Sequence, residues 1–233
     1  MLDYSMRHVR ALGVPGALPS EPRALFGLTR VGAPPERLMR LLDAGRFNLI
    51  LHPKSGGSAR EWPLPHYLEL ARLLGKTDAF KLFLTGSQQE RQLIAQDCPG
   101  LLADGLATDL MGTLSSEELL AFINAADGLL AGSTGPLHVA AALGRHALGI
   151  FPTRPGLDTV SWKPLGPLAR TLSAPGTCRL GSRQCPKKPG PPCVCTQSLQ
   201  PQDVASRLVM PALQHWGELR RPQPAPERAG LVT

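Results

Sequence analysis

The feature that most constrains the fold is a regular alternation of short apolar segments with stretches of helical periodicity. Each apolar segment has the length of a strand and ends in Gly or Pro: FNLILHP (47–53), FKLFLTG (80–86), GLLAG (128–132) and HALGIFP (146–152). Strands that are apolar throughout, rather than at every second position, are typical of a sheet covered on both faces. The segments therefore predict the buried strands of a parallel sheet.

The stretches between these segments predict crossover helices, over 64–75, 87–98, 114–127 and 133–144. Ser87 with Glu90 three residues later has the pattern of a capping box, and Ser115 or Ser116 is expected to cap the third helix. Strands that alternate with helices in this way predict an α/β fold, here a Rossmann-like domain with a parallel sheet over 46–175.

The chain outside this domain has a different character. Residues 1–45 contain a short helical pattern that ends at Gly45, and residues 176–200 form a loop rich in Cys, Pro and Gly. Residues 201–216 predict a C-terminal helix in which Pro211 would introduce a kink, and 217–233 predict a disordered tail. The start lacks an apolar signal sequence, and no apolar stretch approaches the ~20 residues of a membrane span.

The charge balance disfavours nucleic acid as a partner. The chain has 25 Lys and Arg against 18 Asp and Glu, a net charge of +7, but the cations are scattered and aromatic residues make up only 5%. Few aromatic side chains are available for base stacking. A scattered positive charge fits a solvated surface, with attraction to phosphates or to an anionic membrane leaflet.

The cysteines indicate a reducing compartment. Five cysteines is an odd number, which with the absence of a signal sequence predicts a cytoplasmic protein. Four of them lie close together and could ligate zinc as thiolates: Cys178, Cys185, Cys193 and Cys195. No Cys-x2-Cys pair is present, so a surface loop of reduced thiols is the default interpretation.

Ligands of open parallel sheets bind at the carboxyl ends of the strands, where three loops have suitable residues. The loop 52–63 contains two glycines and the cations Lys54 and Arg60, which could pair with an anion. Glu90 in the loop 85–92 could cap its helix or accept hydrogen bonds from ribose hydroxyls. Each loop also has an interpretation as an ordinary turn.

The third loop, GSTGP (132–136), opens a helix with Pro136 in its first turn. Ser133 or Thr134 is placed to cap this helix, and its free N–H groups form a site suited to a diphosphate. His138, one turn further, could face such a ligand or pack as an ordinary residue.

A serine hydrolase is an alternative. Ala131 to Gly135 reads A-G-S-T-G, a variant of the nucleophile elbow, with Ser133 as nucleophile. Asp158 and His215 follow in the required order. However, Pro136 directly follows the motif, and the sequence contains no HGGG-type oxyanion loop.

The three loops, in their order, resemble the C-terminal half of glycosyltransferase family 9, the ADP-heptose:lipopolysaccharide heptosyltransferases. The resemblance rests on ILHPKSGGSAREWPLPHYLELARLL, FLTGSQQE, LSSEELLAFINAADGLLAGSTGPLHVAAALGRHALGIF and SWKPLGP, and covers about 45–215. It implies a GT-B architecture, in which this half binds a nucleotide-diphospho-sugar donor such as ADP-heptose. It also implies inverting transfer to a lipopolysaccharide core or a related glycan, without a metal or another cofactor. We expect a cytoplasmic protein, peripheral at the inner face of the inner membrane.

The resemblance also implies which residues bind the donor. Ser55 and Gly56 match the first donor loop, Arg60 would pair with phosphate, Glu90 would hold the ribose and Leu114 would lie near the adenine. A second set matches the family signature D-[ST]-G-x-x-H around the diphosphate and the sugar: Ser133, Thr134, Gly135 and His138. Ser133 stands where the family usually has Asp.

The family pattern also includes an N-terminal domain that is largely missing here. Residues 1–45 resemble the end of that domain and the interdomain linker, and the catalytic Asp that the family places there has no counterpart. A separate chain with the acceptor domain is therefore an expected partner. The alternative is a non-catalytic nucleotide-binding remnant, or one half of a split glycosyltransferase.

Overall fold

A computed structural model describes residues 23, 26–28, 30–103, 105–176 and 194–220. Its centre is a six-stranded sheet in the order β3-β2-β1-β4-β5-β6, and every neighbouring pair is parallel. The strands are β1 (Phe47–His52), β2 (Phe80–Leu84), β3 (Thr108–Asp109), β4 (Gly128–Ala131), β5 (His146–Phe151) and β6 (Ala169–Ser173). This strand order is that of the Rossmann fold, which confirms the predicted fold class.

The crossover helices lie where the sequence predicts them: α4 (Leu64–Gly75), α5 (Gln88–Asp97), α6 (Ser116–Ala125) and α7 (Gly135–Ala142). Ser87 and Glu90 form the predicted capping box of α5, and Ser115 with Glu118 forms one on α6. Shorter helices lie elsewhere along the chain: α3 (Glu36–Met39) before β1, η1 (Pro99–Leu102) before β3, α8 (Thr159–Trp162) between β5 and β6, and α9 (Val194–Gln197) after β6.

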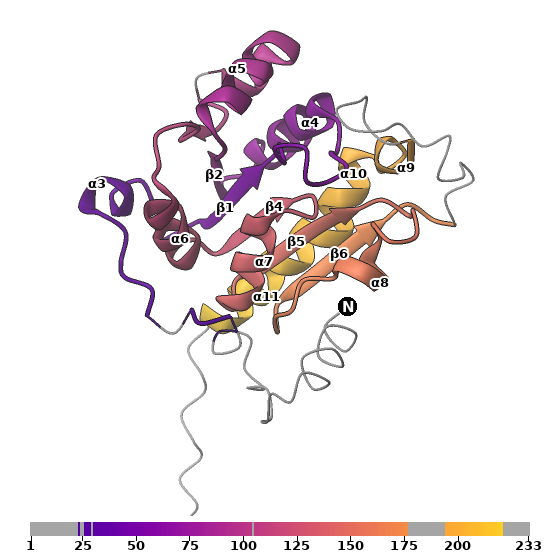
Figure 1. The fold of residues 1–233 in the computed structure, drawn as a ribbon. Helices are drawn as coiled ribbons and strands as arrows, with labels where there is room; N and C mark the ends of the chain where they lie inside the picture. Colours follow the sequence, from indigo (N-terminus) through magenta and orange to yellow (C-terminus); the bar gives the residue numbers. More distant parts are fainter. Residues whose placement is uncertain (1–22, 24–25, 29, 104, 177–193, 221–233) are drawn as a thin grey trace, which may run out of the picture.

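The sheet is the middle of three layers (Figure 1). Side chains on each strand alternate between two apolar cores, so that Phe47, Leu49 and Leu51 face one core and Ile50 faces the other. Helix α4 and the C-terminal helices cover the first face, whereas α3, α6 and α7 cover the second. The covering of both faces explains why β1, β4 and β5 are buried along their whole length.

The C-terminal helical segment comprises α10 (Pro201–Val204), the π-helical turn η2 (Ala205–Val209) and α11 (Met210–Arg220). The π-helical turn lies just before Pro211, where the sequence predicts a kink. Proline has no N–H to donate to the preceding turn of the helix, which disturbs the regular α-helical hydrogen bonds there. The helix continues to Arg220, so residues 217–220 do not belong to the predicted tail, while residues 221–233 lie outside the described part of the chain.

Helix α11 is attached to the amino ends of the strands by a half-buried polar network. The indole Nε1 of Trp216 donates to Oδ1 of Asp127 at 2.8 Å. The other carboxylate oxygen, Oδ2, accepts from the backbone N–H of Asn48 at 2.8 Å and from its side-chain amide at 2.9 Å. One carboxylate therefore joins β1, the turn before β4 and α11.

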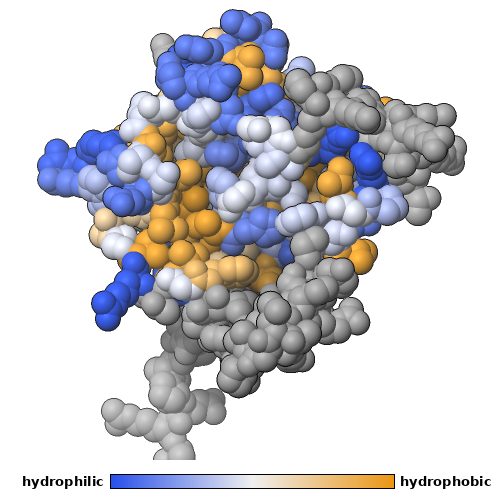
Figure 2. Space-filling model, in the orientation of Figure 1, coloured by the Kyte–Doolittle hydropathy of each residue, from blue (hydrophilic) through white to orange (hydrophobic). Residues whose placement is uncertain are grey.

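On the surface, hydrophilic side chains cover the region of α3 and α5, and an apolar area lies over α6 and α7 (Figure 2). Among the described residues, no helix has the length and apolar content that a membrane crossing requires.

Candidate functional site: a pocket at the carboxyl edge of the sheet

The strand order brings two of the predicted loops together. β1 and β4 are neighbours, but their crossovers leave toward opposite faces of the sheet, which opens a crevice at their carboxyl ends. The loop after β1 and the turn after β4 both begin at this crevice. The loop and the turn approach each other closely, as Gly132 shows: a Cβ atom added to this residue would lie only 3.4 Å from the carbonyl oxygen of Arg60.

The loop after β1 is held in shape by Glu61. The Oε1 atom of Glu61 accepts from the backbone N–H and the hydroxyl of Ser55, both at 2.9 Å, and Oε2 pairs with the Lys54 ammonium at 2.6 Å. Gly56 and Gly57 then turn the chain with φ values of 52° and 80°, which favour glycine. The charge of Lys54 is therefore already neutralised within the loop.

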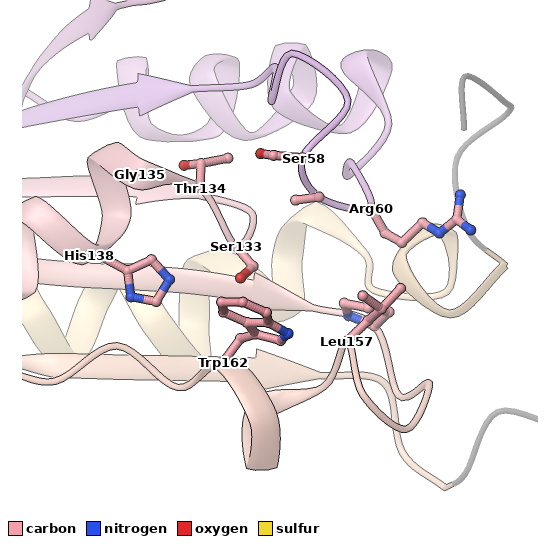
Figure 3. A pocket seen from close by; sticks show the side chains of 10 residues that line it. Ser58, Arg60, Ser133, Thr134, Gly135, His138, Leu157 and Trp162 are labelled. Atoms are coloured by element: carbon pink, nitrogen blue, oxygen red, sulfur yellow. The ribbon is translucent and has the colours of Figure 1, made fainter. Parts of the chain in front are cut away.

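Arg60 is buried, with 7% of its surface exposed. Its Nε atom finds no hydrogen-bond partner among the described residues. Figure 3 shows its side chain extending away from Ser133 and His138. Arg60 therefore lies at the wall of the pocket, but its guanidinium points away from Ser133 and His138. The contact between Arg60 and a donor phosphate stays a prediction.

Glu90 fulfils the helix-capping role and makes an additional contact. Its Oε2 accepts from the N–H and the hydroxyl of Ser87 at 2.8 and 3.1 Å, and its Oε1 accepts from the N–H of Gly56 at 2.8 Å. Burial alone would raise the pKa of Glu90, but these hydrogen bonds and nearby His52 outweigh it and lower the pKa. The carboxylate therefore joins the loop after β1 to α5.

Helix α7 begins without a side-chain cap, unlike α5 and α6. Thr134 is the N-cap residue, as the sequence predicts for Ser133 or Thr134, but its side chain makes no capping hydrogen bond. Thr134 is 4% exposed, and its Oγ1 atom has no hydrogen-bond partner among the described residues. A buried hydroxyl without a partner is uncommon and is often explained by an absent ligand or water.

These elements enclose a pocket of about 260 Å³. It is lined by residues of the loops after β1, β4 and β5: Ser58, Ala59, Arg60, Ser133, Thr134, Gly135, His138, Pro152, Leu157 and Trp162. Figure 3 shows the Ser133 hydroxyl above the Trp162 ring, with His138 on one side. Burial lowers the pKa of His138, so this imidazole is neutral at pH 7.

The structure divides the predicted donor residues into three groups. Arg60 and the second set, from Ser133 to His138, line the pocket. Ser55, Gly56 and Glu90 do not line it, but support the neighbouring loop through the contacts given above. Leu114 packs against the core beneath α6 and does not line the pocket, so its predicted position near an adenine stays untested.

The hydrolase triad is not assembled. Ser133 follows the carboxyl end of β4, whereas the His215 ring lies 3.4 Å from that of His146, the first residue of β5 at the opposite edge. The carboxylate of Asp158 accepts from the N–H of Ser161 and caps α8. His215 therefore lies at the opposite end of the strands from Ser133 and cannot act as its general base, which excludes the proposed triad.

The zinc hypothesis falls mostly outside the described residues, since Cys178, Cys185 and Cys193 are not among them. Cys195 lies in α9, where its sulfur accepts a hydrogen bond from the Thr153 hydroxyl at 3.1 Å. This contact places the end of the cysteine-rich loop beside the segment that follows β5.

The sequence predictions omit Ser58 and Ala59 of the loop after β1, and all the lining residues of the loop after β5: Pro152, Leu157 and Trp162. The loop after β5 has no glycine-rich pattern or hydrophobic periodicity. The loop could have been found only from the strand order. Because β5 is the parallel neighbour of β4, the carboxyl end of β5 and the loop that follows it lie at the same edge of the sheet as the pocket.

The strand order and the position of the pocket define this chain as a Rossmann-like α/β domain with a site at its topological switch point. The model of glycosyltransferase family 9 (heptosyltransferase) matches residues 29–188. The chain therefore belongs to glycosyltransferase family 9.

Individual relatives agree with this assignment. The lipopolysaccharide core heptosyltransferase OpsX of Haemophilus influenzae is 25% identical over 165 residues, which cover 71% of this chain and 46% of OpsX. E. coli ADP-heptose LPS heptosyltransferase II has a similar fold, with a TM-score of 0.57 and 20% identity over 79% of this chain and 54% of that one.

The structure of E. coli heptosyltransferase WaaC with ADP has a TM-score of 0.55 at 18% identity and covers 75% of this chain and 47% of WaaC. The chain thus spans about half the length of the relatives that it matches.

Proposed function

We propose that this chain is the donor-binding half of a heptosyltransferase-type glycosyltransferase and binds a nucleotide-diphospho-sugar in the pocket at the switch point. One observation carries the proposal: α7 begins there without a side-chain cap, and the buried Thr134 hydroxyl beside it has no hydrogen-bond partner in the described part of the chain. A helix N-terminus with free N–H groups favours an anion. The diphosphate of the donor supplies both the charge and the hydrogen-bond acceptors.

The chemistry proposed for this site is inverting transfer without a metal. An acceptor hydroxyl attacks the anomeric carbon and gives up its proton to the catalytic Asp that the family places in the N-terminal domain. The bond from that carbon to the diphosphate oxygen breaks, and the nucleoside diphosphate leaves with the electron pair. Donors at the α7 N-terminus stabilise the negative charge that develops on the leaving oxygen. Arg60 can contribute once its side chain turns toward the pocket, since its Nε has no competing partner.

The donor and the acceptor are proposed with support from the relatives. WaaC has been solved with ADP and with ADP-2-deoxy-2-fluoro heptose, and OpsX is a lipopolysaccharide core heptosyltransferase. We therefore infer ADP-heptose as the donor and a lipopolysaccharide core as the acceptor, reached at the inner face of the membrane. Because the chain spans about half of these relatives, donor binding and sugar transfer are separate predictions.

The experiment is isothermal titration of ADP into the wild-type chain and the Thr134→Val variant. Valine has the shape of threonine but no hydroxyl, and hydrogen bonds to charged groups contribute about 1.5–3 kcal/mol. We expect Thr134→Val to weaken ADP binding about tenfold or more without lowering the melting temperature, because the hydroxyl has no partner to lose.

Thr77→Val is the matched control. The Thr77 hydroxyl donates to the Leu74 carbonyl at the end of α4, away from the pocket, so this variant should bind ADP like the wild type. Wild-type protein that binds neither ADP nor ADP-heptose would refute the proposal. Transfer by the 233-residue chain alone would exclude the alternative of a non-catalytic or split half.

A further inference from the structure

Trp162 is held in a fixed orientation at the rim of the pocket. Helix α8, which contains it, begins with a capping bond from the Ser161 N–H to Asp158 at 3.1 Å. The indole Nε1 of Trp162 donates to the Gly156 carbonyl at 2.9 Å. The polar edge of the indole is therefore already bonded, and what remains for another molecule is the apolar ring.

This ring is exposed in a way that the other tryptophans are not. Trp162 is 41% exposed, whereas Trp62 is 1% exposed and donates to the Leu199 carbonyl inside the core. Trp216 is half-buried against Phe47. An ordered aromatic ring left in water forgoes the free energy of burial, about 25 cal/mol per Å² of apolar surface. Such a ring on a pocket wall is suited to contact a ligand.

The surroundings of the ring are uncharged. Figure 3 shows the Ser133 hydroxyl above the Trp162 ring, His138 to one side and Leu157 to the other. His138 is neutral at pH 7, because burial lowers its pKa. Among the described residues no Asp or Glu lines this pocket, and the side chain of Arg60, their one charged lining residue, extends away from Ser133. A charged substituent on the sugar would therefore lose water at the ring without gaining a partner there, unlike the diphosphate at the N-terminus of α7.

We propose that Trp162 is the platform for the sugar of the donor, with an apolar C–H face of an uncharged hexose or heptose on the indole and its hydroxyls bonded to Ser133 and His138. The assignment rests on the proposed donor site, because the diphosphate at α7 brings the sugar to this side of the pocket. Trp162 is then a specificity-determining residue, which favours donors with an uncharged sugar and contributes nothing to binding of the nucleotide alone.

The test compares ADP-heptose with ADP in the wild type, Trp162→Ala and Trp162→Phe by isothermal titration. Trp162→Ala should weaken ADP-heptose binding about tenfold, on the scale of aromatic contacts, and change ADP binding less than about twofold. Trp162→Phe keeps a ring and should lose less. Val160→Ala is the matched control, because Val160 is on the same helix, is 85% exposed and does not line the pocket.

Tryptophan fluorescence gives a second readout, since Trp162 is the most exposed of the chain's tryptophans. ADP-heptose should change the emission of the wild type but not that of Trp162→Phe. The proposal that Trp162 binds the sugar would be refuted if Trp162→Ala lost ADP and ADP-heptose binding equally, or bound both like the wild type. An emission of the wild type that ADP-heptose leaves unchanged would also refute it. In each of these results the wild type still binds ADP, so they are distinct from failure of the donor site itself.

Discussion

At the scale of single residues, Glu90 combines the predicted helix cap with a contact that the sequence does not reveal. It closes the capping box of α5 and accepts from Gly56 in the loop after β1. Glu90→Gln replaces one acceptor oxygen by a donor, so either the cap or the loop contact is lost. We expect a loss of about 1–2 kcal/mol in the free energy of unfolding, measured in urea, together with weaker ADP binding.

Glu118→Gln separates these effects. Glu118 closes the same kind of capping box on α6, but its other partner is the exposed Arg37 rather than a donor loop. This variant should lose stability and bind ADP normally. If Glu90→Gln also bound ADP normally, the carboxylate would serve helix capping alone.

At the scale of elements, α11 is attached at the amino ends of the strands, and the candidate pocket lies at their carboxyl ends. Trp216→Phe keeps the ring that contacts Phe47 but removes the N–H that donates to Asp127. We expect a lower urea midpoint, equivalent to about 1.5–3 kcal/mol, because the donor to a charged acceptor is lost. ADP affinity should not change, because the pocket lies at the carboxyl edge. Leu219→Ala, at an exposed position of α11, should leave both quantities unchanged.

The elements also show which patterns can be read from sequence. β1, β2, β4 and β5 are predictable because burial on both faces makes them apolar throughout. The sequence gives no comparable signal for β6, an edge strand that is only partly buried, or for β3, which has two residues. The loops after β1 and β4 are predictable as pocket-forming loops from their glycines and their place after strands. The orientations of Arg60 and Trp162, in contrast, depend on packing that no local pattern encodes.

At the scale of the whole molecule, buried histidines make stability depend on pH. Burial, with smaller contributions from His215 and Arg170, lowers the pKa of His146 to about 4. As pH falls below about 6.5, the unfolded chain gains a proton that the folded protein binds only near pH 4, so stability falls across this interval. The free energy of unfolding that His146 makes dependent on pH is present in full above pH 6.5, and it amounts to on the order of 3 kcal/mol.

We expect His146→Gln to flatten the dependence of the urea midpoint on pH between 6.5 and 4. Some slope should remain, because burial also lowers the pKa values of His52, His66 and His138. A slope identical to that of the wild type would show that His146 is not responsible.

The attachment of α11 beneath the sheet has a consequence for how this domain can change over evolutionary time. The network of Trp216, Asp127 and Asn48 lies at the amino ends of the strands, a full strand length from the loops that line the pocket. Substitutions in those loops therefore leave the anchoring network intact, and their effects on stability and on ligand choice should add independently. A domain built in this way can acquire a different ligand preference through a few loop residues while it keeps its fold.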